Sequence, residues 1–228
     1  MEKLGSIEEL RSLRTRLKEE VPNDRKTVQV CCGTACTATG SKGIVAAFEA
    51  ESKRGIADIE ITKTGCQGLC QKGPVMKVEP YEFFYIKANS KNVGEIISKT
   101  FFSGNPVRKL LYRESVMDEP IRRMDDLPFY KKQLRIVLRN NGKIDPCNIN
   151  HYIATDGYAA LEKVLSAMTP DQVIEEIKKS KLRGRGGAGF PTGTKWEYAR
   201  KSRGKVKFII ANGDEGDPGA FMDRSLME

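Results

Sequence analysis

The sequence predicts an α/β protein in two parts, chiefly from the order of its elements. After a leader helix over residues 1–25, strand-like and helix-like segments follow in the order βαββα up to residue 102. Residues 103–130 hold three prolines, mixed charges and little periodicity, which predicts a linker. Residues 131–228 form a second part with helices, one apolar strand and two glycine-rich turns. Because this part has no partner strands, its single strand cannot form a sheet by itself.

Local signals place the individual elements. Ser6 and Glu9 match a capping box at the start of the leader helix. Thr169, Pro170 and Gln172 combine an N-cap, a proline at the first helical position and a second capping box. The first part is expected to contain strands at 27–31 and 56–62, a hairpin of 75–79 with 83–87, and helices at 42–53 and 92–102. The second part is expected to contain helices at 133–139, 158–168, 170–180 and 195–201 and a strand at 206–211.

The distribution of charge favours a bound phosphate group over a nucleic acid. The chain has a net charge of +9, and residues 178–207 hold 11 basic residues against one acid. The same segment contains the densest run of glycines, and the rest of the chain is close to neutral. Aromatic residues are not interleaved with the bases in the manner of a stacking platform. We therefore expect no nucleic-acid partner.

Membrane insertion and secretion are also not expected. The sequence has no run of eighteen apolar residues. Its first ten residues, MEKLGSIEEL, carry acids where a signal peptide needs a basic end and an apolar core. We expect a cytoplasmic protein, in which six cysteines indicate metal ligation or redox chemistry before structural disulfides.

Four cysteines follow the first two predicted strands in two pairs. Cys31 and Cys36 are separated by four residues, and Cys66 and Cys70 by three. Both pairs lie at the same end of neighbouring strands, so the four thiols can converge. The spacing in glycine-rich loops suits a [2Fe–2S] cluster held by four thiolates. Zinc and thiol chemistry remain alternatives, because structural zinc sites use similar spacings.

The other potential ligands receive structural interpretations. Strand alternation turns Cys32 away from Cys31 and toward the core. Cys147 is interpreted as a bystander thiol, and His151, the single histidine, as structural. With one histidine, no catalytic triad can be assembled, which excludes a hydrolase of that type.

The cysteine motif resembles a known family. Cys31-x4-Cys36 together with residues 64–74, TGCQGLCQKGP, resembles the thioredoxin-fold [2Fe–2S] ferredoxins. These occur free, as the E-type component of NADH–quinone oxidoreductase, and fused to flavoprotein subunits of NAD-linked hydrogenases. The resemblance implies a thioredoxin-like [2Fe–2S] ferredoxin domain over residues 26–102.

A second glycine-rich loop satisfies the pattern G-x-G-x-x-G between Gly184 and Gly189. A capped helix precedes this loop where a dinucleotide-binding fold needs a strand, so a conventional Rossmann site is rejected. The spacing up to Lys195 also fails the Walker pattern. A flexible basic linker is the alternative, but Phe190 is unusual in linkers. The preferred interpretation is a loop whose N–H groups cradle a phosphate, with Arg185 and Lys195 as charge partners.

Acidic and amide side chains follow the apolar strand near the end of the sequence. Asn212, Asp214 and Glu215 lie where ligands of α/β folds collect, and they can accept hydrogen bonds from ribose hydroxyls, amides or flavin N–H groups. The alternative is a solvated acidic turn, which is equally acceptable for Asp217.

These two segments resemble the signatures of the NADH-binding flavoprotein family. The resemblance rests on residues 182–196, LRGRGGAGFPTGTKW, and 212–224, NGDEGDPGAFMDR, and it implies the N-terminal part of an α/β FMN/NADH-binding domain over 131–228. The positions it assigns to FMN are Gly184, Arg185, Gly186, Gly187, Gly189 and Lys195, with Asn212 and Asp214 on the ring side. It places Glu215, the expected catalytic residue, by the nicotinamide, and Phe190 and Tyr198 beside the adenine. The family usually has alanine at Gly213, leucine at Thr194 and often glutamate at Asp217, which weakens only the Asp217 contact.

The resemblance also implies cofactors and partners. A [2Fe–2S] cluster, FMN and NAD(H) or NADP(H) are expected, whereas the family's [4Fe–4S] cluster is expected only beyond residue 228. The implied function is electron transfer between NAD(P)H, FMN and iron–sulfur clusters, of the NADH dehydrogenase or NAD-linked hydrogenase type. Partners would be iron–sulfur subunits of a hydrogenase, formate dehydrogenase or NADH dehydrogenase complex. The alternatives are a non-catalytic [2Fe–2S] carrier with an inactive partial flavin domain, and a zinc-stabilised interaction module.

Overall fold

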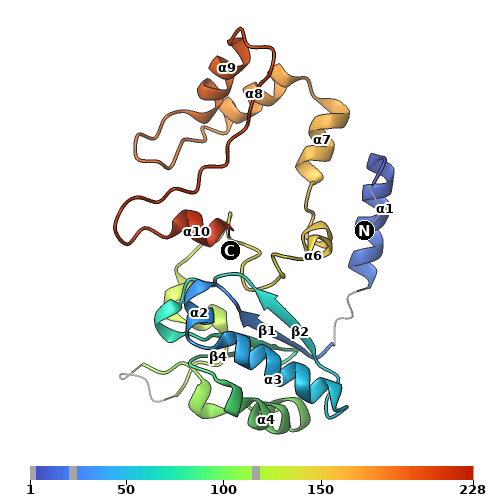
Figure 1. Ribbon diagram of the computed structural model, residues 1–228, viewed down its shortest axis with the longest axis vertical. Coiled ribbons are helices and arrows are strands. Elements are labelled where there is room, and N and C mark those ends of the chain that lie inside the picture. The colour runs from blue at the N-terminus through green and yellow to red at the C-terminus, as the bar shows by residue number, and fades with distance from the viewer. Residues whose placement is uncertain (1–3, 21–24, 115–118, 228) are drawn as a thin grey trace. The chain divides into compact units, whose positions relative to one another are not determined.

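A computed structural model describes residues 4–20, 25–114 and 119–227 (Figure 1). The chain divides into two compact units, each of which is described by itself. The helical unit comprises Met1–Leu10 and Asp156–Asn212, and the sheet unit comprises Arg11–Thr155 and Gly213–Glu228. Helix α1 (Ile7–Glu19) crosses the boundary between them, and the Ser6 hydroxyl accepts a hydrogen bond from the Glu9 N–H at its start (3.1 Å). None of the helices within the described ranges has the length and apolar character needed to span a bilayer.

A four-stranded mixed sheet organises the sheet unit, and its strand order is β2-β1-β3-β4. The strands are β1 (Thr27–Cys31), β2 (Glu60–Thr64), β3 (Met76–Glu79) and β4 (Phe83–Tyr85). β1 pairs parallel with β2 in a register that places Cys31 opposite Thr64, whereas β3 is antiparallel to both β1 and β4. The predicted βαββα order is therefore observed, with β2 beginning four residues later than expected.

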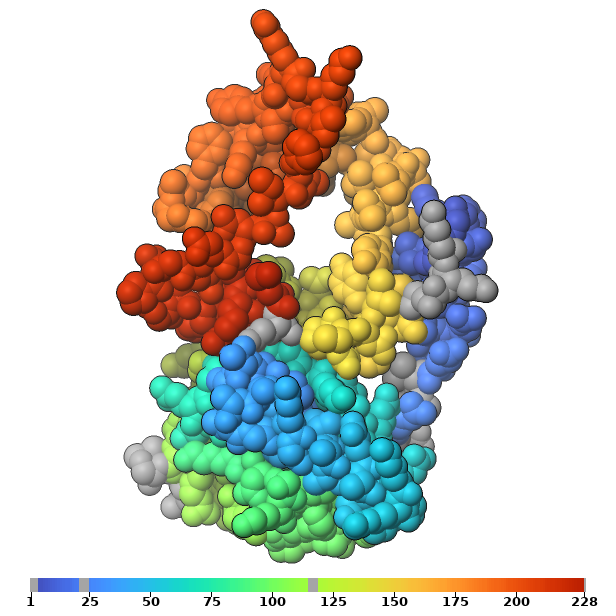
Figure 2. All heavy atoms as spheres, in the orientation of Figure 1, coloured from blue at the N-terminus to red at the C-terminus, as the bar shows by residue number. Residues whose placement is uncertain are grey.

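Helices and short turns surround this sheet. They are α2 (Thr34–Ala38), α3 (Ser41–Lys53), η1 (Cys70–Lys72), η2 (Ser90–Asn92), α4 (Val93–Ile96), the π-helical turn η3 (Ile97–Phe102), η4 (Arg108–Leu110), η5 (Met124–Asp126), α5 (Pro128–Lys131), α6 (Ile149–Ala154) and α10 (Met222–Met227). Ile44 and Phe48 of α3 pack in one apolar cluster with Val28 and Val30 of β1. In Figure 2 the light-blue to green atoms of this part form one close-packed body.

The structure differs from the prediction of a linker over residues 103–130. Val107 and Leu111 are buried in the same apolar cluster as α3, and Leu127 and Tyr130 are buried in a second cluster with Cys31. Isolated bridges join Tyr85 to Leu111 and Tyr112 to Ile121, so the segment extends the sheet edge irregularly. The apolar side chains of this segment follow neither a helical nor a strand period, because the chain turns every few residues. Periodicity in the sequence therefore could not predict that the segment packs on the sheet.

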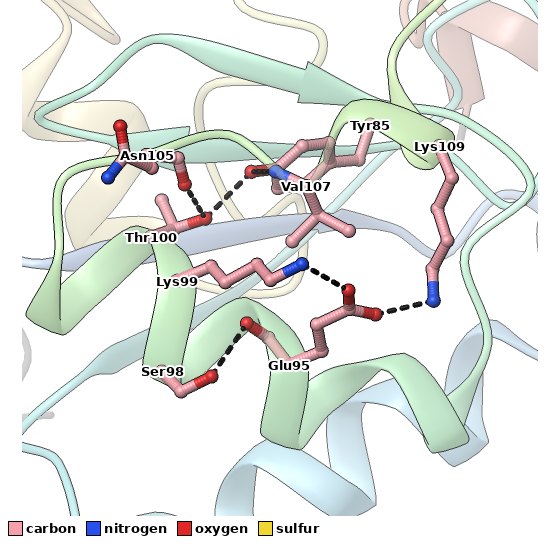
Figure 3. Close-up of polar contacts among 8 residues, drawn as sticks. All are labelled: Tyr85, Glu95, Ser98, Lys99, Thr100, Asn105, Val107 and Lys109. Carbon is pink, nitrogen blue, oxygen red and sulfur yellow. Dashed lines mark hydrogen bonds and ion pairs between the residues drawn. The ribbon is translucent and has the colours of Figure 1, made fainter.

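A hydrogen-bonded chain fastens this segment to the core (Figure 3). The N–H of Val107 donates to the Tyr85 hydroxyl (3.0 Å), which lies 2.7 Å from the Thr100 hydroxyl. Thr100 donates in turn to the carbonyl of Asn105 (3.2 Å), so the Tyr85 proton is directed at Thr100. Each of these two buried hydroxyls thereby both donates and accepts a hydrogen bond, as burial requires. Burial raises the pKa of Tyr85, which keeps the hydroxyl protonated as a donor.

An ion-pair cluster lies next to this chain. The Glu95 carboxylate bridges Lys99 (2.9 Å) and Lys109 (2.5 Å), which joins α4 to η3 and to η4 (Figure 3). Hydrogen bonds from Lys109 and then Lys99 lower the pKa of Glu95 below its ordinary value of 4.5.

The helical unit contains α7 (Ala159–Ala167), α8 (Pro170–Lys179) and α9 (Thr192–Lys201). The predicted capping box is present: Thr169 accepts from the Gln172 N–H (3.3 Å), and the Gln172 side chain accepts from the Thr169 N–H (2.7 Å). Helices α8 and α9 pack together, with Arg200 paired to Asp171 at 3.2 Å.

Two predicted elements are absent from the described structure. Residues 133–139 form turns rather than a helix, and Leu134 and Val137 are largely exposed. A seven-residue helix is marginal without an apolar face to bury, and here none is buried. Residues 206–211 form no strand, and Ile209 is fully exposed. No strand pairs with this segment in the described residues, so its backbone lacks the hydrogen bonds that would make it a strand.

We expect Tyr85→Phe to lower the free energy of unfolding by about 1–3 kcal/mol, because the buried N–H of Val107 loses its acceptor. Denaturant unfolding followed by circular dichroism measures this. Tyr81→Phe is the matched control, since the Tyr81 hydroxyl has no partner among the described residues, and it should change stability by less than about 0.5 kcal/mol. Equal effects of the two substitutions would contradict the assigned role.

We expect the Glu95 cluster to make stability depend on pH. A carboxyl whose pKa is lowered in the folded state stabilises the protein above its ordinary pKa of 4.5, and this contribution disappears as the pH falls through the lowered value. Glu95→Gln should therefore destabilise the protein at pH 6 and converge with the wild type at strongly acidic pH. Unfolding midpoints across this range test it. Glu49→Gln, which removes a single looser ion pair with Lys63 (3.6 Å), should show a smaller pH-dependent difference.

Candidate functional site

Parallel strand pairing brings the two cysteine loops to one edge of the sheet. Because Cys31 lies opposite Thr64, the carboxyl ends of β1 and β2 coincide. Cys36 is carried by the short helix α2, which follows β1, and Cys70 opens the turn η1, which follows β2. The backbone N–H of Cys32 donates to the carbonyl of Thr64 (2.8 Å), so the two loops leave the sheet side by side.

The four thiols interact within and between the loops. Cys36 is hydrogen-bonded to Cys31, and Cys66 to Cys70. Electrostatic interactions also join Cys36 with Cys70 and Cys66 with Cys31. The hydrogen bond to Cys31 raises the pKa of Cys36, and burial raises the pKa of Cys66. The structure thus brings together the four predicted ligands.

The surroundings of the thiols fit an iron–sulfur cluster. The N–H of Gly68 donates to Sγ of Cys66 (3.4 Å), an interaction that stabilises a ligating thiolate. A Cβ added to Gly73 would lie 3.0 Å from Sγ of Cys36, so only glycine leaves this thiol its space. Four sulfur donors suit both a [2Fe–2S] cluster and zinc. In the described part of the chain, no three His, Cys, Asp or Glu side chains form a ready-made site for a single metal ion.

The remaining cysteines and the histidine lie apart from this site. Cys32 packs against the other apolar cluster, as strand alternation predicts. Burial raises its pKa. Cys147 is exposed. Nδ1 of His151 accepts a hydrogen bond from the N–H of Asp145 (3.1 Å), which agrees with a structural role for the ring.

A cover over the second cysteine loop was missed by sequence reasoning. The Tyr130 hydroxyl donates to the carbonyl of Gln67 (2.9 Å), and burial raises the pKa of Tyr130, so this proton is retained. The ring of Phe129 lies 3.7 Å from the position a Cβ on Gly68 would take. Both residues come from α5, which lies within and just beyond the predicted linker, and no sequence signal marked them.

Asn141 and Gly142 complete this cover. Nδ2 of Asn141 donates to the carbonyl of Cys66 (2.9 Å). Gly142 has a φ of +80°, and a Cβ there would lie 3.0 Å from the side chain of Gln67. Glycine is therefore needed both for the left-handed backbone and for the close approach. The Asn-Asn-Gly sequence at 140–142 is a turn signal that indicates the bend but not what it contacts.

The predicted phosphate loop is closed at its base in the helical unit. Gly184 donates to the carbonyl of Phe190 (2.9 Å) and Thr192 to that of Leu182 (3.0 Å), while Arg183 bridges to Pro191. The Arg183 side chain donates to the carbonyl of Gly189 across the loop. As predicted, a capped helix, α8, precedes this loop.

The tip of the loop is open to a ligand. A Cβ on Gly186 would meet nothing within 4 Å, and Arg185 and Lys195 are exposed. Phe190 and Tyr198 lie together, with ring centroids 6.4 Å apart and an interplanar angle of 49°. The loop, the two bases and the aromatic pair thus share one unit, together with Asn212.

The acidic signature belongs to the other unit. Asp214 and Glu215 fall in the sheet unit. The Glu215 carboxylate accepts hydrogen bonds from the N–H groups of Asp223 (2.6 Å) and Arg224 (3.2 Å) at the start of α10. In this structure Glu215 is therefore a helix-capping residue, and its expected place by a nicotinamide remains a prediction.

Comparisons with known proteins decide the family of each part. Residues 16–100 match the profile of the thioredoxin-like [2Fe–2S] ferredoxin family, and residues 177–228 match that of the Nuo51 FMN-binding domain. The chain joins a ferredoxin domain to part of an Nuo51 domain. This confirms both predicted resemblances and the α/β fold class. We call these parts the ferredoxin domain and the Nuo51 segment below.

Individual relatives agree with this assignment. The chain is 56% identical over 98 residues to the HndC subunit of the NADP-reducing hydrogenase of Solidesulfovibrio fructosivorans, which covers 43% of this chain and 20% of that protein. It is 50% identical over 93 residues to the F 2 subunit of the NADH-quinone oxidoreductase of Rhizobium meliloti, which covers 41% of this chain and 22% of that protein. The chain thus spans about a fifth of the length of these relatives. Among solved structures, a thioredoxin-like [2Fe–2S] ferredoxin from Aquifex aeolicus is 30% identical, with a TM-score of 0.36, over 38% of this chain and 89% of that one.

We expect Gly193→Ala to separate α8 from α9. An added Cβ would lie 2.6 Å from Cγ and 2.8 Å from the backbone N of Lys178, which forces the helices apart. Overpacking of this kind costs about 1–3 kcal/mol, and hydrogen exchange in both helices would report it. Gly186→Ala, where a Cβ meets nothing within 4 Å, is the control and should leave exchange unchanged. Identical exchange in the two variants would contradict this packing role.

Proposed function

We propose that this chain is an electron-transfer oxidoreductase subunit that passes electrons between NAD(P)H, FMN and iron–sulfur clusters. The observation that carries the proposal is the convergence of Cys31, Cys36, Cys66 and Cys70 at one sheet edge, in a chain that also contains two flavoprotein signatures. The names of the relatives, an NADP-reducing hydrogenase subunit and an NADH-quinone oxidoreductase subunit, support an oxidoreductase of this type, and diaphorase activity is part of the proposal. When bound, FMN supplies conversion between two-electron and one-electron transfer, and the cluster supplies one-electron transfer.

Residues of the ferredoxin domain would hold the cluster, and α5, which follows that domain, would shield it on one side. The four thiols bind as thiolates, and the Gly68 N–H stabilises the negative charge on Cys66. Phe129 and Tyr130 of α5 lie against the loop that carries Cys66 and Cys70, and the Tyr130 hydroxyl donates to the carbonyl of Gln67. Shielding of the cluster from solvent and N–H donors to its sulfurs shift the reduction potential of the cluster in opposite directions. The balance between these two effects sets that potential.

The residues of the Nuo51 segment bind the nucleotides. The backbone N–H groups from Gly184 to Gly189 would bind the FMN phosphate, and Arg185 and Lys195 would neutralise its charge. Phe190 and Tyr198 present their rings to an adenine. Asn212 and Asp214 would accept hydrogen bonds from the flavin ring, and Glu215, held at the start of α10, would lie beside the nicotinamide.

The expected partners and location follow from the same proposal. Iron–sulfur subunits of a hydrogenase, NADH dehydrogenase or formate dehydrogenase complex would accept or deliver the electrons, and the complex would lie in the cytoplasm. In this proposal, a [4Fe–4S] cluster is bound by the part of the longer relatives that this chain does not match.

A second candidate is a [2Fe–2S] electron carrier without flavin catalysis. The capping of α10 by Glu215 favours it, because that carboxylate is occupied by two backbone N–H groups. The two candidates differ in whether NADH reduces the cluster.

We expect the anaerobically purified chain to show the visible bands of a [2Fe–2S] cluster and a flavin shoulder, both of which bleach with NADH. Cluster bands that bleach with dithionite but not with NADH would support the second candidate, a [2Fe–2S] electron carrier, over the first. A colourless protein that contains zinc would exclude both.

Cys36→Ala and Cys66→Ala are each expected to abolish the cluster bands and to lower the iron content from about two atoms per chain, because each removes one of four thiolate ligands and alanine supplies no donor in its place. Cys32→Ala and Cys147→Ala are the matched controls and should retain the bands, since Cys32 faces the other apolar cluster and Cys147 is exposed. Loss of the bands in Cys32→Ala together with their retention in Cys36→Ala would reverse the ligand assignment.

A further inference from the structure

We propose that Asn141 is a positioning residue that fastens the acidic end of the Nuo51 segment to the cysteine loop of the ferredoxin domain. This inference rests on the proposed function and adds a residue to it. Nδ2 of Asn141 donates one hydrogen bond to the carbonyl of Cys66 (2.9 Å) and another to the carbonyl of Ser225 in α10 (3.1 Å). All three residues belong to the sheet unit.

The chemistry of this contact requires a side chain with two donors. A primary amide nitrogen carries two hydrogens, and both are used here, one for each carbonyl. Aspartate offers no donor, leucine has neither donor nor acceptor, and a serine hydroxyl has a single proton. Asparagine meets the requirement without adding a charge beside the cysteine loop.

The position of Asn141 is fixed from the ferredoxin side. Its N–H donates to the carbonyl of Leu138 (3.1 Å), and the left-handed Gly142 brings the turn against Gln67. The turn cannot shift without moving the residue next to the Cys66 ligand.

On the other side, the contact reaches the acidic signature through α10. Glu215 accepts from the N–H groups of Asp223 and Arg224, the two residues before Ser225. The Ser225 hydroxyl donates to the carbonyl of Phe221 (2.9 Å), which closes the same turn. Holding the carbonyl of Ser225 therefore holds Glu215, the residue expected beside the nicotinamide, at a set place relative to the cysteine loop.

Such a contact sets geometry and supplies no chemistry. Electron transfer between two sites of one protein slows as their separation grows, and two hydrogen bonds from the Asn141 side chain hold the segments that carry them together. Misplacing reacting groups by about 1 Å can slow a reaction about 100-fold.

The test compares Asn141→Leu with Asn140→Leu in the full chain. Leucine has the shape of asparagine without its donors. Asn140 is the matched control, because its side chain donates to Thr155 (3.3 Å) and contacts neither Cys66 nor Ser225 in the described structure. Three readouts are needed: hydrogen exchange of the amides at 222–227, the iron content with the visible spectrum, and the rates of cluster reduction by NADH and by dithionite.

We expect Asn141→Leu to keep its iron, to exchange the amides at 222–227 about fivefold faster, and to be reduced by NADH roughly tenfold more slowly. Reduction by dithionite should be unchanged, since dithionite does not depend on the Nuo51 segment. Asn140→Leu should match the wild type in all three. Asn141→Gln keeps both donors and should recover part of the protection at 222–227.

Unchanged exchange at 222–227 in Asn141→Leu would overturn the proposal, whatever NADH does. Loss of the cluster in both Asn141→Leu and Asn141→Gln would also overturn it, because the residue would then serve the cysteine loop alone. If NADH fails to reduce the wild-type cluster, the proposed function fails by itself, and the exchange comparison still decides the role of Asn141.

Discussion

The parallel pairing of β1 with β2 is the constraint on which the rest of this structure depends. Cys31 ends one strand and Thr64 ends the other, and their register aligns the two carboxyl ends. Two loops that are about thirty residues apart in sequence therefore leave the sheet at one place. If the register shifted by one residue, the side chains of β2 would exchange faces and the loop would leave at a different height. The site is thus a consequence of the backbone ladder before any thiol contributes.

The second requirement is a cover, and an irregular part of the chain supplies it. Residues that follow the βαββα unit pack Leu127 and Tyr130 against the cluster that contains Cys31 and Cys36. Tyr130 satisfies the Gln67 carbonyl and Asn141 satisfies that of Cys66. Burying a loop leaves its backbone carbonyls in need of donors, and these two side chains meet that need. The ferredoxin domain is therefore functionally longer than its strands and helices suggest.

The two flavoprotein signatures differ in how far contacts within the signature itself determine its conformation. The glycine loop closes on itself through Gly184, Phe190 and Thr192 and lies between two helices that pack on each other. The acidic turn is instead held by two contacts. Glu215 caps α10, and Asn141 donates a hydrogen bond to the carbonyl of Ser225 in that helix. The apolar residues 206–211 that precede this turn form no strand, because a strand needs a neighbour and the described residues offer none.

What the sequence determined by itself was local or periodic. The capping box at Thr169, the strand pattern of 27–31 and the cysteine spacings each depend on contacts within a few residues, so they were predictable. The direction of Cys32 followed from strand alternation alone. Only the tertiary structure decided that Val107, Leu111 and Leu127 pack in the apolar clusters of the sheet unit, that 133–139 is not a helix, and that Tyr130 and Asn141 reach the cysteine loop. These outcomes depend on which surfaces of the sheet remain exposed once it has formed. Contacts between segments that are far apart in the chain produce no periodic pattern in the sequence, so they could not be predicted from it.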